Sequence, residues 1–117
     1  MLSHEVMFDA LTSNLERYMD LLSARQKLVV SNIANVDTPG YKTRDIDFQS
    51  EFRNVVDSTR PQPAEISGLK TKNDGNNVNI DRESRLLSEN DLRFGIASSL
   101  LRSRLKTLRS AIEEKTG

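Results

Sequence analysis

The feature that most constrains this chain is the long segment Ser3 to Ile33, which contains neither glycine nor proline. Its apolar residues recur at steps of three, four or seven, the spacing of one face of an α-helix. A helix of this length spans roughly 45 Å, and its apolar stripe must pack on something to be stable in water. The segment therefore predicts a long packing helix. Its predicted face comprises Phe8, Leu11, Leu15, Tyr18, Leu22 and Val29.

A second long amphipathic segment begins near Asp81 and continues to the end of the chain. Asp81 and Glu83 suit the positive amino end of a helix dipole. From Asn90 onward the apolar steps average about 3.67 residues per turn, which favours a straight helix over a left-handed heptad coil. The predicted face comprises Leu87, Phe94, Ala97, Leu101, Leu105, Leu108 and Ile112.

Residues that break helices separate the two segments. Pro39 disfavours a helical conformation at Thr38, so the first helix should end near Asn35. Pro39 and Gly40 fit the two central positions of a type II turn, in which Gly40 has a positive φ.

The rest of the middle is predicted to be short and irregular. Asp45 or Asp47 could cap a short helix whose apolar face includes Phe48 and Phe52 together with Val55 and Val56. Residues 60–79 are polar and rich in Pro, Gly and Asn, so we expect a loop there, with a short extended piece at 77–80.

These patterns predict an all-α fold, in which two long terminal helices pack as an antiparallel, coiled-coil-like pair around a short irregular middle. We divide the chain into a helix at 1–35, a turn, short helix and connector at 36–80, and a helix at 81–117. The apolar share of only 36% predicts a thin core, so that either the fold is simple and helical or partners complete it.

Charge supports the antiparallel arrangement. The 17 basic and 17 acidic residues give a net charge of zero, which disfavours nucleic acid as a partner. The start of the chain is acidic, with Glu5, Asp9, Glu16 and Asp20, whereas Arg93 to Arg109 is basic. Antiparallel helices would place these opposite charges together, within a subunit or between neighbours.

Catalytic and metal-binding patterns are missing from the sequence. Its single histidine, His4, has no second histidine to work with, and cysteine is absent. A calcium loop beginning at Asn77 would place Arg82 and Ser88 where Gly and Glu are needed. We therefore expect no enzyme activity, no cofactor and no small-molecule substrate. No transmembrane segment or cleavable signal peptide is predicted either.

Some polar and small residues on the predicted helices leave two interpretations open. Asn14, Asn32 and Asn90 could be boundary positions that touch water, or buried amides that set the helix register. A neighbouring helix could approach closely on the side that carries small residues, which are Gly95, Ala97, Ser98, Ser99 and Ser103. Gly95 should lower the stability of its helix by up to about 1 kcal/mol relative to Ala.

The segment Ser31 to Lys42, SNIANVDTPGYK, resembles the amino-terminal signature of the flagellar rod and hook family of axial proteins. Segments 45–48 and 74–83 also resemble parts of rod proteins with short middles. The resemblance covers both ends of the chain and gives a candidate assembly signature. Its residues are Asn32, Ala34, Asn35, Thr38, Pro39, Gly40 and Tyr41.

This resemblance implies a structural subunit of the rod that crosses the periplasm, exported by the flagellar type III apparatus without a cleaved signal. It further implies self-assembly in a helical array, with other rod proteins and with basal-body and export-gate components as partners. A soluble helical adaptor or chaperone-like binding module is the alternative. An adaptor should be stable alone, whereas an axial subunit should have weakly ordered ends until it is assembled.

Overall fold

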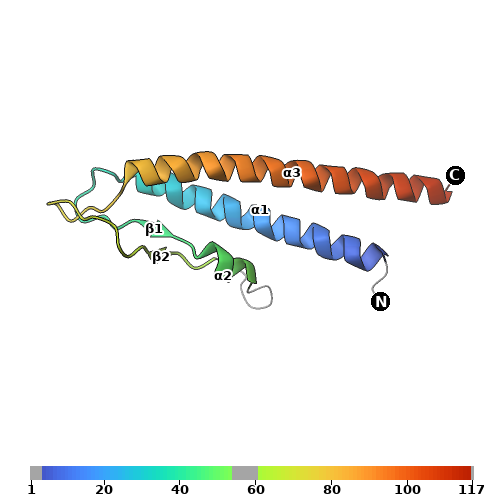
Figure 1. Cartoon of the computed structure of the whole chain (residues 1–117), viewed down its shortest axis with the longest axis horizontal. Helices are drawn as coiled ribbons and strands as arrows, with labels where there is room; N and C mark the ends of the chain where they lie inside the picture. The colour runs from blue at the N-terminus through green and yellow to red at the C-terminus, as the bar shows by residue number, and fades with distance from the viewer. Residues whose placement is uncertain (1–3, 54–60, 117) are drawn as a thin grey trace.

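The computed structural model describes residues 4–53 and 61–116, and two long helices dominate it (Figure 1). They are α1, His4–Ala34, and α3, Ile80–Thr116. Between them lie β1, Arg44–Asp45, α2, Phe48–Arg53, and β2, Ala64–Glu65. The chain reverses through this middle and α3 returns along α1, so the predicted antiparallel helical fold is confirmed.

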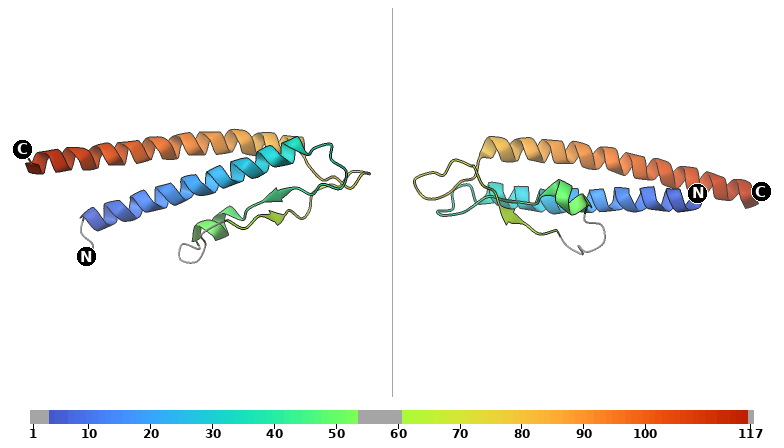
Figure 2. Two further views of the ribbon diagram at one scale, coloured as in Figure 1. Left: turned by 180° about the vertical axis from the view of Figure 1, so that it is seen from behind. Right: turned by 60° about the horizontal axis from the view of Figure 1, so that its bottom comes forward.

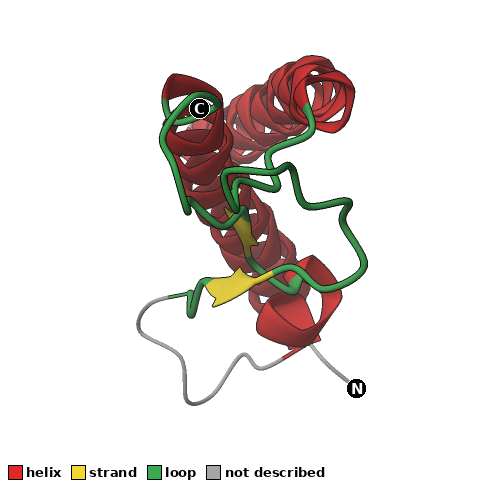
Figure 3. Ribbon diagram, turned by 90° about the vertical axis from the view of Figure 1, so that its left-hand side faces the viewer, coloured by secondary structure: helices red, strands yellow, loops and turns green. Residues whose placement is uncertain are grey.

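Helix α1 is the central element of an elongated molecule whose longest dimension is 69 Å. It contacts α3 on one side and β1 and α2 on another. Figure 2 shows the middle segment on the side of α1 that faces away from α3. The end-on view shows the two long helices side by side, with the strand pair beside α1 (Figure 3).

Hydrogen bonds fix the register of α1 against α3. Near the turn, the Asn32 Nδ2 donates to the Glu83 Oε1 at 3.1 Å. Two turns further along, the Asn90 Nδ2 donates to the Leu22 carbonyl oxygen at 2.7 Å and to the Gln26 Oε1 at 2.9 Å. Position numbers rise on one helix as they fall on the other, which is the antiparallel register. The predicted pairing of the basic stretch of α3 with the acidic start of α1 stays a prediction, since the side chains of Glu5 and Asp9 lie outside the described ones.

The buried apolar core lies toward the turn end of the helical pair. Its members are contributed by α1, α3 and the middle segment. They are Leu21, Leu22, Val29, Ile46, Val78, Leu86 and Ala97. Further along α3, Leu105 is 48% exposed and Ile112 is 54% exposed. The core is therefore thin and one-sided, and the distal half of α3 has little cover.

Side-chain caps begin α2 and α3. The Asn79 Oδ1 accepts a hydrogen bond from the Arg82 backbone N–H at 3.0 Å, which caps α3. The Asp47 Oδ1 accepts from the Ser50 N–H at 3.2 Å, which caps α2. Of the two predicted caps for the short helix, Asp47 is thus the one used. Val55 and Val56, predicted to continue that helix, lie outside the described residues.

The predicted extended piece at 77–80 is wrong at Ile80, whereas residues 77–79 lie in neither a helix nor a strand. The structure places the strand at Ala64–Glu65, where it pairs antiparallel with β1 so that Arg44 lies opposite Glu65 and Asp45 opposite Ala64. Ile80 is already the first residue of α3. The strand at Ala64–Glu65 was not predicted, because a two-residue strand is defined by its distant partner and leaves no periodic pattern of its own. Among the described residues, no helix is long and apolar enough to cross a membrane.

The position of the core predicts unequal local stability along α3. In a dilute monomer, backbone amides at 101–114 should exchange hydrogen much faster than those at 83–97, because few buried contacts hold the distal turns closed. Hydrogen exchange read by NMR or mass spectrometry measures this directly. Uniform protection along α3 would contradict the prediction and would indicate a monomer that needs no partner.

Candidate functional site

The segment that follows α1 forms the predicted type II turn. The Tyr41 N–H donates to the Thr38 carbonyl oxygen at 3.2 Å, which places Pro39 and Gly40 at the central positions. Gly40 has a φ of 75°, as the third residue of this turn requires. The side chain of Asn35 stabilises the approach by accepting from the Thr38 hydroxyl at 3.0 Å. The local sequence thus dictates where α1 ends and how the chain leaves it.

A second loop packs against this turn from far along the chain. The Gly40 N–H donates to the Asp74 carbonyl oxygen at 2.9 Å. Gly75, at a φ of 87°, lies so close that a Cβ on it would stand 3.3 Å from the Gly40 Cα. The buried Asn76 donates from Nδ2 to the carbonyl oxygens of Asn35 and Thr38, each at 2.8 Å. This contact between the two loops was not predicted, because the local sequence of the Asn-rich segment indicates only an ordinary loop.

Asn32 is the centre of a buried polar cluster. Its Nδ2 donates to the Arg44 carbonyl oxygen at 2.9 Å and to the Glu83 Oε1 at 3.1 Å. Its Oδ1 accepts from the Tyr41 hydroxyl at 2.9 Å and from the Arg44 N–H at 3.2 Å. Only 1% of Asn32 is exposed, and its amide has hydrogen-bond partners. Of the two interpretations, Asn32 is therefore the buried amide that sets the helix register. Asn90 behaves likewise, whereas Asn14 is exposed.

Two buried carboxylates join this cluster through arginine. Asp45 accepts a two-point contact from Arg25, at 3.1 and 2.9 Å, and a third hydrogen bond from Arg82 at 2.9 Å. Arg82 also donates to the Glu83 Oε1 at 2.7 Å. Asp45 is 4% exposed and Glu83 is fully buried. Breaking one such pair leaves an uncompensated buried charge, so the cluster ties α1, β1 and α3 together.

The predicted signature residues divide between this interior and the surface. Asn32 and Tyr41 are brought together in the cluster, and Asn35 lies half-buried at the helix end. The other members of the signature face solvent. They are Ala34, Thr38, Pro39 and Gly40. The signature therefore both holds the turn and presents an outer surface beside it.

The predicted face of α1 serves more than one contact. Leu22 and Val29 are buried, Leu15 is half-buried and Leu11 is 41% exposed. Tyr18 packs edge-to-face on Phe48 and Phe52 of α2, with ring centroids 5.4 and 6.0 Å away. The side chain of Phe8 lies outside the described residues.

The predicted face of α3 is split between α1 and solvent. Ala97 is buried, and Leu87, Leu101 and Leu108 are half-buried. Phe94, Leu105 and Ile112 are between 40% and 54% exposed. The buried line against α1 runs instead through Glu83, Leu86, Asn90 and Ala97, because polar residues that find partners were given no weight in the apolar pattern.

Comparison with known proteins gives one consistent result. A family model described as flagella basal body rod protein matches residues 19–42, which span the second half of α1 and the turn. The chain is 30% identical to the flagellar basal body rod protein FlgB of Escherichia coli K12, over 92% of this chain and 98% of the relative. It is 29% identical to FlgB of Salmonella typhimurium over the same shares. FlgB of Bacillus subtilis is 26% identical, over 91% of this chain and 95% of the relative.

The turn geometry predicts that Gly40→Val destabilises the fold. A β-branched residue at a φ of 75° is strained, so the free energy of unfolding should fall by about 1–3 kcal/mol. Denaturant unfolding followed by circular dichroism measures this change. Gly95→Val, at an exposed helical glycine where an added Cβ meets nothing within 4 Å, is the control and should have a smaller effect. Equal stability of Gly40→Val and the parent would mean that the turn adopts another conformation in solution.

The polar cluster predicts a larger penalty for Asn32→Ala. The substitution leaves the Glu83 carboxylate and the Arg44 backbone without their buried partner, so stability should fall by about 2–4 kcal/mol. Asn14→Ala, an exposed asparagine on the same helix, should change stability by less than about 0.5 kcal/mol. Similar unfolding midpoints for the two variants would rule out the cluster as the main tie between α1 and α3.

Proposed function

Because the chain belongs to the FlgB family of flagellar basal-body rod proteins, it is a structural rod subunit, and we propose that it polymerises through its two long helices. The observation that carries the proposal is the apolar surface of α3. Phe94, Leu105 and Ile112 stay at least 40% exposed although they belong to its apolar pattern. Exposed apolar surface of this kind is typical of protein interfaces.

A heterologous contact between such surfaces repeats from copy to copy. When the rotation between copies does not close into a ring, the result is a helical filament. In this mechanism the polar cluster around Asn32 holds α1 and α3 at a fixed register, and the distal halves of the helices supply the adhesive surface. The signature residues that face solvent, including Thr38 and Pro39, are proposed to contact a neighbouring subunit at the other end.

We propose that the subunit makes and breaks no covalent bond. Its buried Asp45 and Glu83 are engaged by arginine and asparagine side chains, an arrangement that suits a structural tie. Among the described residues no group of three or more His, Cys, Asp or Glu side chains is placed to hold a metal ion. Its function is then mechanical, because it transmits torque as one subunit of the rod.

The family places the protein in the flagellar basal body, where it assembles with other basal-body proteins. The finer location is a proposal. The family resemblance supports a position in the periplasmic part of the rod, export by the flagellar type III apparatus, and contacts with rod and export-gate proteins. The adaptor alternative is not favoured, since the relatives match over nearly their whole length.

Incorporation into basal bodies tests the polymerisation proposal. In a strain lacking its own FlgB, epitope-tagged chain should be recovered in purified basal bodies and should restore swimming. Leu105→Gln with Ile112→Gln removes exposed apolar surface and should lower incorporation by about tenfold or more, while the monomer keeps its helix content.

Ala111→Gln is the matched control, because Ala111 is also exposed on the distal part of α3. It should be incorporated as efficiently as the parent chain. If the double variant entered basal bodies as well as this control, the exposed face of α3 would not be an assembly surface.

A further inference from the structure

Each of the two long helices carries exposed charges on a side that the fold of one chain leaves open. On α1 these are Glu16 and Asp20, and on α3 they are Arg102 and Lys106. Among the described residues, none of these four side chains takes part in an ion pair. Two acids on one helix and two bases on the other are therefore open to a partner.

The two acids of α1 are turned away from the contacts that α1 makes within the chain. Leu22 contacts α3, and Arg25 contacts Asp45 of β1. Since a helix turns by about 100° per residue, Glu16 and Asp20 lie about 120° or more around α1 from both Leu22 and Arg25. Further exposed residues follow at steps of three and four and complete what we call the outer stripe of α1. It comprises Glu16, Asp20, Ser23 and Lys27.

The connector borders this stripe without covering it. Pro61 and Pro63 line an open hollow together with Asp20, Ser23 and Lys27 of the stripe. The hollow leaves room beside Asp20 for a long side chain that comes from outside the chain.

The two bases of α3 are likewise turned away from α1. Asn90 and Ala97 are buried on the side that faces α1. Arg102 and Lys106 lie about 120° or more around α3 from both of them. Arg109, further along the same side, already pairs with Glu113 of its own helix at 3.4 Å.

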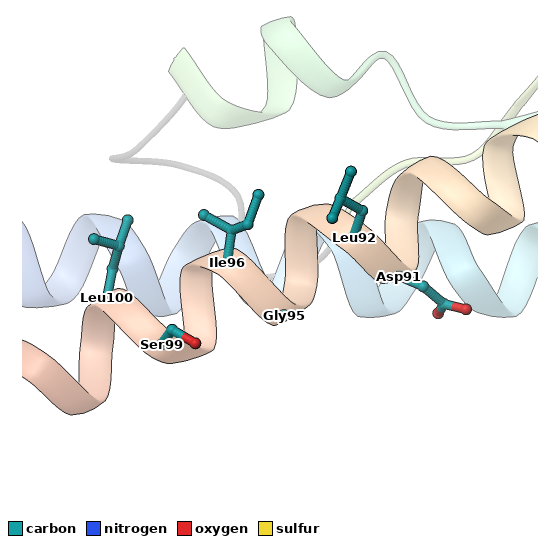
Figure 4. Close-up of a pocket in the computed structure, with 6 residues that line it drawn as sticks. All are labelled: Asp91, Leu92, Gly95, Ile96, Ser99 and Leu100. Carbon is teal, nitrogen blue, oxygen red and sulfur yellow. The ribbon is translucent and has the colours of Figure 1, made fainter.

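Figure 4 shows the continuation of this side of α3 toward the turn. Three residues with charged or small side chains lie along one side of the helix, which are Asp91, Gly95 and Ser99. The apolar Leu92, Ile96 and Leu100 point to another side. The outer stripe of α3 is therefore a surface separate from the apolar row. It comprises Asp91, Gly95, Ser99, Arg102 and Lys106, all of them exposed.

We propose that the outer stripe of α1 in a second copy of this chain docks on the outer stripe of α3. The proposal rests on the proposed rod function and specifies one contact between neighbouring subunits. Each subunit would bind one neighbour through α1 and another through α3, so the contact is heterologous and repeats from copy to copy. Because repetition keeps every copy pointing the same way, α3 and the α1 of its neighbour run antiparallel, as they do within one chain.

Charge complementarity identifies this occupant. Arg102 and Lys106 are four residues apart, and so are Glu16 and Asp20. In the antiparallel arrangement Arg102 lies opposite Asp20 of the second copy, and Lys106 lies opposite Glu16. Both bases then meet an acid, and exposed pairs of this kind select direction and register while apolar contacts supply most of the affinity.

The same register fits the rest of both stripes. Ser99 lies opposite Ser23 of the second copy, and Gly95 lies opposite Lys27. Asp91 is one helical turn beyond Gly95, so the long side chain of Lys27 can reach it across a position that has no side chain. Small residues therefore face each other between charge pairs of opposite polarity at the two ends of the contact.

Contacts between identical helices fit less well. A parallel pair of identical stripes would set Arg102 and Lys106, or Glu16 and Asp20, against themselves. An antiparallel pair of identical stripes is a two-fold contact that closes on itself and cannot propagate a filament.

The register also gives an axial step between copies. Within the chain, Asn90 of α3 is level with the turn of α1 from Leu22 to Gln26. In the proposed contact, Asn90 is level with Asn32 of the second copy. The neighbour is therefore displaced along α3 by about eight residues, or about 12 Å at 1.5 Å per residue. Such a displacement produces a helical arrangement of subunits instead of a flat ring.

Charge reversal with rescue tests the pairing. In a strain lacking its own FlgB, Arg102→Glu with Lys106→Glu should lower recovery in purified basal bodies by about tenfold or more, because like charges replace opposite ones. Adding Glu16→Lys and Asp20→Lys to the same chain restores opposite charges and should recover most of the incorporation. The unfolding midpoint of the monomer should stay close to that of the parent, since all four side chains are exposed.

Arg85→Glu with Arg93→Glu is the matched control, because it makes the same change of net charge on exposed residues of α3 outside the outer stripe. It should be incorporated about as well as the parent. If the fourfold variant is incorporated no better than Arg102→Glu with Lys106→Glu, the pairing is wrong although the rod function stands. A control that falls as far as that double variant would show that net charge, and not the stripe, matters, and would also overturn the inference.

Cysteine cross-linking tests the register, because the chain has no native cysteine. Ser23→Cys and Ser99→Cys, each with a different epitope tag, are co-expressed in the same strain, and basal bodies are treated with a short bismaleimide. A dimer carrying both tags should form, and neither variant alone should give a dimer. Ser23→Cys with Ser110→Cys, three turns further along α3, is the control and should give none.

The outcomes separate this contact from the proposed function. If both variants enter basal bodies without a doubly tagged dimer, the contact is wrong although the rod function stands. A dimer of Ser99→Cys with itself would indicate contact between two α3 helices and would also overturn the inference. If the parent chain never enters basal bodies, the rod function is wrong, and the contact with it.

Discussion

The hydrogen bond between Asn32 of α1 and the buried carboxylate of Glu83 in α3 is the contact on which the rest of the structure depends. Asn32 also bonds the backbone of Arg44, so one side chain joins both long helices to the middle segment. An apolar contact at this position would tolerate sliding by a turn. A buried amide and carboxylate do not, since any shift leaves them without partners at a cost of several kcal/mol.

Arginine completes this arrangement. Arg25 and Arg82 converge on Asp45, and Arg82 also pairs with Glu83. Such buried ion pairs add little net stability compared with a well-packed apolar core. Any other arrangement of the helices, however, would leave a buried charge without its partner, which is costly. In a chain with a thin core, they define which arrangement of the helices is the folded one. Asn76 extends the same principle to the turn by binding the carbonyl oxygens at the end of α1.

The concentration of these contacts at one end leaves the other end of the helical pair for partners. Beyond Ala97 the side chains of α3 have little cover, and exposed leucine and isoleucine residues occupy more than one of its faces. This division suits a filament subunit. One end of the helical pair fixes the direction of the helices, and the other provides apolar and charged surface that a neighbouring subunit can bury.

The sequence alone predicted the elements whose causes are local. Apolar spacing located α1 to within a residue, and the Pro39–Gly40 pair specified the turn, because backbone preferences act on neighbouring residues. Tertiary structure alone decided that β2 lies at Ala64–Glu65, that Asp45 is an ion-pair partner instead of a cap, and which face of α3 is buried. A hydrogen bond or ion pair between distant residues depends on where each helix points after folding. Apolar periodicity predicts that a helix has an apolar face. Polar residues such as Glu83 and Asn90 are buried beside that face only when a hydrogen-bond partner lies across the interface.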